Sequence, residues 1–96
     1  SYYWTWRLLA SGFTLEQCVT IRNMPWEVLL NHVLRAVEEG RPVAIEACLP
    51  GELIEELRRV VGTETPAQIR PLLDELPAGT VHQEVQLYVL LACRPG

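Results

Sequence analysis

The stretch from Thr14 to Gly40 restricts the fold more than any other part of this chain, because its pattern predicts two helices joined by a tight turn. Thr14 followed by Gln17 is a capping box, in which the threonine hydroxyl accepts a backbone hydrogen bond and the glutamine side chain reaches back. Asn23 suits the turn because asparagine tolerates the left-handed backbone conformation that ends a helix. Pro25 suits the first turn of the next helix, where its missing N–H costs nothing.

Each of these two predicted helices has one apolar face. In the first helix the inward positions follow helical spacing from Leu15 through Cys18 and Val19 to Arg22. In the second helix the inward residues are Trp26, Leu29, Val33, Ala36 and Val37, with Leu30 and Leu34 widening the stripe. Two short helices with a tight turn and a shared apolar face are typical of a helix-turn-helix motif. Many helical domains contain such a pair without touching DNA, so the motif alone does not establish a nucleic-acid function.

The remaining sequence predicts four more helices and one short extended segment. The helices are expected over residues 1–11, 50–61, 65–76 and 81–93, and Pro71 is expected to break the third of these. Thr80 with Gln83 repeats the capping-box pattern before the last helix, which is apolar nearly all round and is therefore expected to be the buried centre. Weak alternation over residues 41–49 predicts a rudimentary wing-like strand.

These elements predict an all-α fold: a small bundle of five or six helices built on the helix-turn-helix, winged-helix-like, with at most one rudimentary strand. Ninety-six residues make a single domain, 1–96. The chain has no apolar run of about 18 residues, so no membrane span is expected. It also lacks a signal-peptide pattern and an initiator Met, so we expect a cytoplasmic fragment of a larger protein.

Charge and cysteine usage limit the classes of function. The net charge of −4 argues against tight DNA binding, because non-specific affinity comes mostly from neutralising phosphates. All eight basic residues are arginine, which coding bias in a GC-rich genome explains. The three cysteines are far apart and lie among apolar neighbours, so we expect buried thiols in a reducing compartment and no zinc site.

No grouping of residues predicts catalysis. The chain has no Gly-rich phosphate loop, no lysine, no Ser-His-Asp grouping and no metal-ligand spacing, so we expect neither an enzyme nor a cofactor nor a metal within these residues. His32 lies near the edge of an apolar stripe and is expected to be a hydrogen-bonded structural residue.

Two groups of residues are candidates for binding. The outward face of the helix after Pro25 carries Asn31 and Arg35, which could reach base edges in a major groove, but Glu27 and Glu38 share that face and would meet phosphate unfavourably. The aromatic residues near the N-terminus could stack on bases, although core packing is the favoured interpretation because only one basic residue lies among them. These residues are Tyr2, Tyr3, Trp4 and Trp6, with Arg7 as the basic neighbour.

A spread of motifs along nearly the whole chain resembles the helix-turn-helix domain at the C-terminus of many RecQ-type DNA helicases. The matching residues are Ser1-x-x-x-Thr5-x-x-Leu8-x-x-x-Gly12, Leu15-Glu16, Arg22-x-Met24, Leu29-x-x-His32-Val33-x-x-Ala36-Val37-Glu38-x-Gly40, Val43-x-Ile45, Ile69-Arg70-Pro71-Leu72 and Glu84-Val85-Gln86-Leu87.

This resemblance implies a non-catalytic, all-α accessory domain downstream of an ATP-dependent helicase, assisting DNA binding in DNA repair or holding other domains of the parent helicase. Two positions depart from the family pattern. Pro25 replaces a small polar residue, which puts direct DNA reading in doubt, and His82 replaces a frequent aromatic residue.

The leading hypothesis is therefore auxiliary DNA binding. The helix start at Thr14 would hold phosphate, and the other candidate contacts are Arg7, Arg22, Asn31 and Arg35. For Arg22, the alternative to DNA contact is a structural role. The competing hypothesis is a protein-docking or intramolecular packing module without DNA contact, which the acidic balance and the aromatic N-terminus favour. A free-standing transcription regulator is less favoured, because the sequence shows neither a basic recognition face nor a dimer interface.

Overall fold

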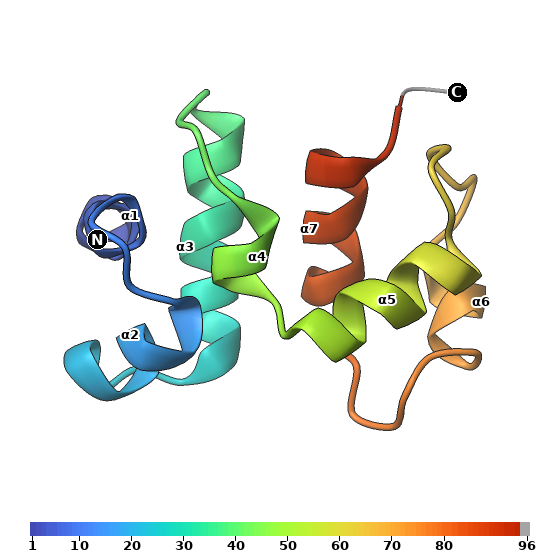
Figure 1. Cartoon of the computed structure of the whole chain (residues 1–96), viewed down its shortest axis with the longest axis horizontal. Helices are drawn as coiled ribbons and strands as arrows, with labels where there is room; N and C mark the ends of the chain where they lie inside the picture. Colours follow the sequence, from blue (N-terminus) through green and yellow to red (C-terminus); the bar gives the residue numbers. More distant parts are fainter. Residues whose placement is uncertain (95–96) are drawn as a thin grey trace.

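The structure is a computed structural model that describes residues 1–94, and over this range the chain forms helices and no sheet. Figure 1 shows α3 and α7 side by side, with α1 and α2 on one flank and α5 and α6 on the other. This arrangement confirms the predicted all-α fold class. In chain order the helices are α1 (Tyr2–Ala10), α2 (Leu15–Arg22), α3 (Trp26–Glu38), α4 (Ile45–Cys48), α5 (Gly51–Val60), α6 (Arg70–Leu73) and α7 (His82–Ala92).

The predicted helix-turn-helix is confirmed as α2, a turn and α3. The Thr14 hydroxyl accepts from the Gln17 N–H at 3.1 Å, and Gln17 Oε1 accepts from the Thr14 N–H at 2.9 Å, which completes the capping box. Asn23 ends α2 in the left-handed conformation with φ of 53°. Pro25 was expected in the first turn of α3, but it lies one position earlier. It is the N-cap residue and has an extended backbone.

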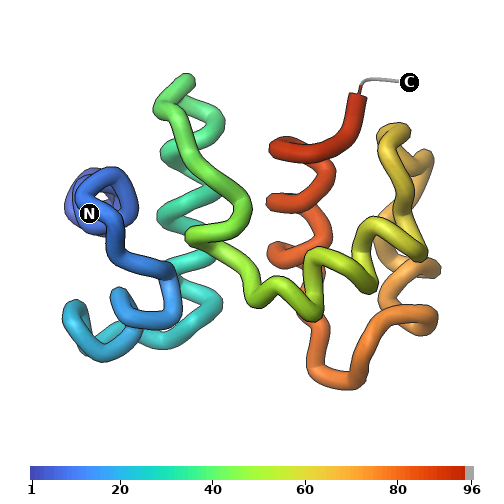
Figure 2. Tube along the Cα trace, in the orientation of Figure 1, coloured from blue at the N-terminus to red at the C-terminus, as the bar shows by residue number. Residues whose placement is uncertain are grey.

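Helix α3 is the centre of the fold. It packs against α1, α2 and α7, and Figure 2 traces the chain through these helices. The sequence predicted instead that α7 would be buried on every side, and that prediction is wrong. Leu90 on α7 is 48% exposed, so one flank of α7 faces solvent. The buried residues of α3 are Leu29, Leu30, Val33, Leu34 and Ala36.

The predicted strand over residues 41–49 is also wrong, because its second half forms the short helix α4. The Ala47 N–H donates to the Ala44 carbonyl at 3.1 Å, and the Leu49 N–H donates to the Ile45 carbonyl at 3.0 Å. Local hydrogen bonds therefore satisfy a backbone that has no partner strand beside it. Within residues 1–94, β pairing is limited to one isolated bridge between Glu64 and Arg94, so the fold has no wing.

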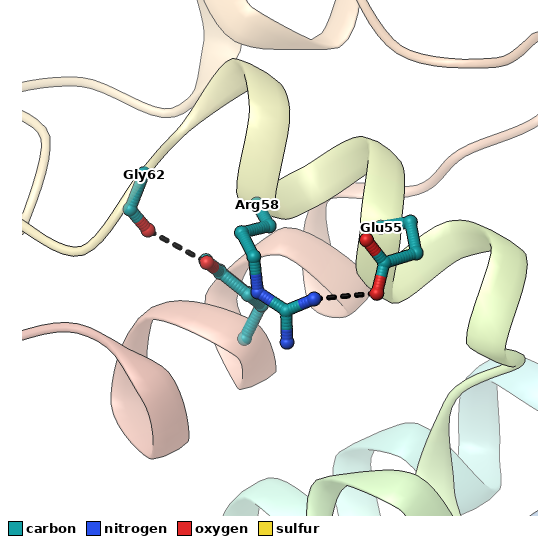
Figure 3. Close-up of polar contacts among 4 residues, drawn as sticks. Glu55, Arg58 and Gly62 are labelled. Carbon is teal, nitrogen blue, oxygen red and sulfur yellow. Dashed lines mark hydrogen bonds and ion pairs between the residues drawn. The ribbon is translucent and has the colours of Figure 1, made fainter.

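The segment between α5 and α7 is less helical than its sequence predicts. Thr65 does not cap a helix, because its N–H and hydroxyl both donate to the Arg94 carbonyl, at 3.0 and 2.7 Å. The helix in this segment is the short α6, which has Pro71 in its first turn, as expected, but ends at Leu73 instead of Leu76. Nearby, the Tyr88 hydroxyl donates to the Gly62 carbonyl at 2.6 Å, and Figure 3 shows that carbonyl accepting the bond. This bond ties α7 to the end of α5.

The start of α7 also differs from the expected capping box at Thr80. The Thr80 hydroxyl donates to the Pro77 carbonyl at 2.7 Å and so closes the preceding turn. The N-cap residue is Val81, whose N–H donates to Glu84 Oε1 at 2.9 Å. The other carboxylate oxygen of Glu84 accepts from Trp26 Nε1 at 3.1 Å, which links α7 to the start of α3. Glu84 therefore caps the start of α7 with one oxygen and joins α7 to α3 with the other.

Candidate nucleic-acid interface

The exposed face of α3 carries two of the predicted contact residues, Asn31 and Arg35, and both side chains are open to solvent. Arg35 lies 3.8 Å from a carboxylate oxygen of Glu39, one turn further along. The two predicted acidic neighbours, Glu27 and Glu38, are also exposed. Because the basic charge lies at the C-terminal end of the helix and Glu27 at its start, this face is better suited to phosphate contact than to insertion of the helix start into a groove.

Arg22 does not project from the surface in the same way. Its Nη1 donates to the Ser1 carbonyl at 2.9 Å and to Thr5 Oγ1 at 2.7 Å, and the side chain is half-buried. These bonds join the end of α2 to the start of α1. The geometry therefore favours the structural alternative for Arg22, with a cation that also suits the C-terminal end of α2.

His32 completes a polar network with Thr5, which is fully buried. The Thr5 Oγ1 atom lies 2.8 Å from His32 Nδ1. Because Arg22 donates to the Thr5 oxygen, the hydroxyl hydrogen of Thr5 is free to donate to Nδ1, which requires a neutral imidazole. Burial lowers the pKa of His32, and the charge of Arg22 lowers it further. The predicted role of His32 as a hydrogen-bonded structural residue is confirmed.

The free energy of unfolding of the domain should consequently decrease as the pH is lowered, because folded His32 resists protonation. The unfolded chain takes up a proton at the ordinary pKa of 6.5, whereas the folded chain resists protonation. The contribution is therefore complete above pH 6.5 and is lost as the pH falls through the lower pKa of folded His32. Urea unfolding at a series of pH values should show this loss.

A His32→Gln variant should lose that part of the pH dependence, because it has no imidazole to protonate. The matched His82→Gln variant, at an exposed histidine outside the network, should keep it. Equal pH dependence in the wild type and the His32→Gln variant would contradict the assignment.

Thr14 has its hydroxyl engaged within the capping box, where it accepts from the Gln17 N–H. Two carboxylate residues, Glu16 and Glu46, line the same small hollow beside Thr14. A phosphate placed there would meet negative charge at close range, which offsets the attraction of the helix start. The geometry therefore supports a structural role for Thr14 more strongly than a phosphate contact.

The structure assembles a surface that the sequence did not reveal, which we call the arginine–aromatic patch. It brings the first turns of α1 together with the end of α3 and the residues that follow it. Its six members are Tyr2, Tyr3, Trp6, Arg7, Arg35 and Arg41.

Arg41 lies at the centre of this patch. Its guanidinium carbon is 4.7 Å from the ring centre of Trp6 and 4.9 Å from that of Tyr3. Its Nε donates to the Tyr2 hydroxyl at 3.4 Å, and this bond is the main reason that the pKa of Arg41 is raised. Trp6 is itself held by a 3.0 Å bond from Nε1 to the Pro42 carbonyl. Stacking on two rings gives the guanidinium a defined orientation.

The other two arginines of the patch lie at its edges. The guanidinium of Arg35 is 5.4 Å from the ring centre of Tyr2. The guanidinium of Arg7 is 5.9 Å from that of Tyr3, and its Nη1 donates to the Tyr3 hydroxyl at 3.1 Å. Three cations from three places in the sequence therefore converge on one group of rings.

The charge of Arg41 is not neutralised by an ion pair. No carboxylate lies within ion-pair distance of Arg41 in the range 1–94. On α5, by contrast, Arg58 contacts Glu55 at 2.5 Å (Figure 3), and Arg59 contacts Glu56 at 2.6 Å. Arg41 therefore retains guanidinium donors for an external anion, and phosphate is the anion that a planar arginine fork fits.

The excess of acidic residues lies in the part of the chain that does not form the arginine–aromatic patch. Residues 1–44 hold four arginines and four acidic residues, whereas residues 45–94 hold four arginines and eight acidic residues. The patch therefore belongs to the part of the chain with no net charge. The overall charge of −4 is consequently only weak evidence against anion binding at this surface.

Within residues 1–94, no three histidine, cysteine, aspartate or glutamate side chains gather as a metal site. Over the same range, none of the helices combines the length and the apolar composition needed to cross a bilayer.

Comparison with known proteins identifies one family. A family model described as a helix-turn-helix domain matches residues 1–89, which includes all seven helices except the last residues of α7. Neither a curated protein nor a solved structure matches the chain significantly. The match covers most of the sequence and agrees with the capped α2, the left-handed turn and α3. The chain therefore belongs to the helix-turn-helix domain family.

Proposed function

We propose that this chain is a non-catalytic DNA-binding domain, auxiliary to a RecQ-like DNA helicase. Membership of the helix-turn-helix family suggests interaction with DNA, and the resemblance in sequence motifs supports the helicase as the parent protein. The observation that carries the proposal is Arg41, which lies over the Trp6 ring and has no ion-pair partner among residues 1–94, beside the exposed Arg35.

The arrangement supports contact with the phosphate backbone more than reading of base edges. Arginines that contact phosphate fix the orientation of a protein on DNA without conveying sequence. The start of α3, where many helix-turn-helix proteins read bases, offers Trp26 and Glu27 and no cation. We therefore expect binding that depends little on sequence, is weak at physiological salt and strengthens as salt is lowered.

The test is a fluorescence-anisotropy titration of the chain with duplex, forked and single-stranded DNA at low and physiological salt. We expect salt-sensitive binding, with dissociation constants roughly in the micromolar range at low salt. Absence of binding to all three DNA forms at low salt would refute the proposal and favour the docking alternative.

The helicase assignment needs a separate measurement in the parent protein. Deleting residues 1–96 should weaken DNA binding by the helicase and leave its DNA-saturated ATPase rate unchanged. A DNA affinity unaffected by the deletion would contradict the auxiliary role, even if the isolated domain binds DNA.

A further inference from the structure

A second surface, which shares only Arg7 with the arginine–aromatic patch, lies in the groove between α1 and α2. The groove has a volume of about 380 Å³ and is lined by Trp4, Arg7, Leu8, Ser11, Ile21 and Arg22. Trp4 is 59% exposed and Ile21 is 50% exposed, so two of the largest exposed apolar side chains of the described chain lie on this one surface. Apolar side chains gathered on a polar surface mark sites of interaction.

The groove has a positive rim and no acidic residue among those that line it. Neither Arg7 nor Arg22 has a carboxylate within ion-pair distance, as far as residues 1–94 are concerned. Arg22 is half-buried, and its Nη1 donates to two neutral groups, the Ser1 carbonyl and the Thr5 hydroxyl. Arg7 and Arg22 therefore present positive charge at the groove with no carboxylate among the residues that line it.

We propose that this groove docks an acidic amphipathic helical peptide from a partner protein. Apolar side chains of the peptide would lie on Trp4 and Ile21, and its carboxylates would pair with Arg7 and Arg22. Helical peptides commonly bind by placing apolar residues of one face into such a groove. Tryptophan and arginine, both present here, are the residue types that most often dominate binding energy at interfaces.

The apolar lining favours a peptide over DNA. Phosphate and sugar would leave the exposed flank of Trp4 and the side chain of Ile21 without an apolar partner, whereas leucine or phenylalanine would bury both. This inference does not rest on DNA binding, since Arg35 and Arg41 lie outside the groove.

The first test uses a synthetic fluorescent peptide with leucine at every third or fourth position of a helix and glutamate between. Two companion peptides replace the glutamates with lysine or the leucines with serine. Anisotropy titration of the intact chain should show binding of the acidic leucine peptide and at least tenfold weaker binding of both companions. Equal binding of the lysine peptide, or no binding of any peptide, would overturn the proposal.

The second test locates the site with surface variants. Ile21→Ser and Arg7→Glu should each weaken peptide binding by roughly tenfold, which is about 1.4 kcal/mol. The matched control is Leu90→Ser, because Leu90 is similarly exposed, at 48%, but lies on α7. Circular dichroism should show that all three variants keep the fold. Equal weakening by Leu90→Ser would overturn the location.

Two further outcomes would identify a different occupant. If duplex DNA displaces the peptide and Ile21→Ser weakens DNA binding, nucleic acid occupies the groove and the peptide proposal fails. If sedimentation shows self-association that Ile21→Ser abolishes, a second copy of the chain occupies the groove, and the peptide proposal fails as well.

Discussion

Replacing Leu30 with alanine should lower the free energy of unfolding by about 2–5 kcal/mol. Leu30 is fully buried on α3, the helix that contacts α1, α2 and α7, so its truncation opens a cavity at the junction of these elements. A small domain has a total stability of about 5–15 kcal/mol, so this loss would be a large fraction of it. Urea denaturation followed by circular dichroism measures the effect.

The adjacent residue supplies the control. Asn31 is exposed on α3, so Asn31→Ala should change stability by no more than about 0.5 kcal/mol. A similar loss in both variants would mean that α3 is not the buried centre described here.

Reversing the charge of Arg35 and Arg41 on the arginine–aromatic patch should have the largest effect on DNA binding. The Arg35→Glu/Arg41→Glu double variant removes two candidate phosphate contacts and adds two negative charges at the same surface. We expect the DNA affinity at low salt to fall by more than about tenfold and the salt dependence of the remaining binding to decrease. Anisotropy titration across a range of salt concentrations checks both quantities.

The matched control is Arg70→Glu/Arg94→Glu, which changes the net charge equally at two exposed arginines from the C-terminal half. This variant should bind DNA much better than the patch variant. Arg41→Lys adds a second control, because it keeps the charge while losing the planar stack on Trp6 and Tyr3. Equal loss in both double variants would show that overall charge, and not this surface, governs binding.

Features set by neighbours in sequence were predictable. The capping box at Thr14 needs only the spacing to Gln17, and the left-handed turn needs only the tolerance of Asn23 for that conformation. The buried stripe of α3 follows from helical periodicity over thirteen residues. The capping groups lie within one turn of each other, and the buried stripe is visible in the spacing of apolar residues along one helix, so both can be predicted without the tertiary structure.

Features set by distant partners were not predictable. The wing-like strand failed because, in the part of the chain that the structure describes, no second strand lies beside residues 41–49 to pair with it. No local pattern predicts that Trp26, at the start of α3, donates to Glu84 on α7. The apolar composition of α7 does not reveal that its flank at Leu90 stays open.

The candidate site divides in the same way. The sequence pointed to Arg35 and Asn31 because both lie on the outward face of a periodic helix, and the structure places both side chains in solvent. It favoured core packing for the aromatic residues of α1 because only Arg7 lies near them in the chain. Arg41 follows those rings by some 35 positions, and no local pattern connects them.

By itself the sequence determined the helical class, the capped helix-turn-helix and the inner and outer faces of α3, because hydrogen-bond spacing and periodicity act over short distances. Only the tertiary structure decided that Arg41 stacks on Tyr3 and Trp6, that Arg22 joins α1 to α2, and that Trp4 and Ile21 share a groove. These contacts depend on how α1 packs against α2 and α3, since packing brings together side chains that the chain itself keeps far apart.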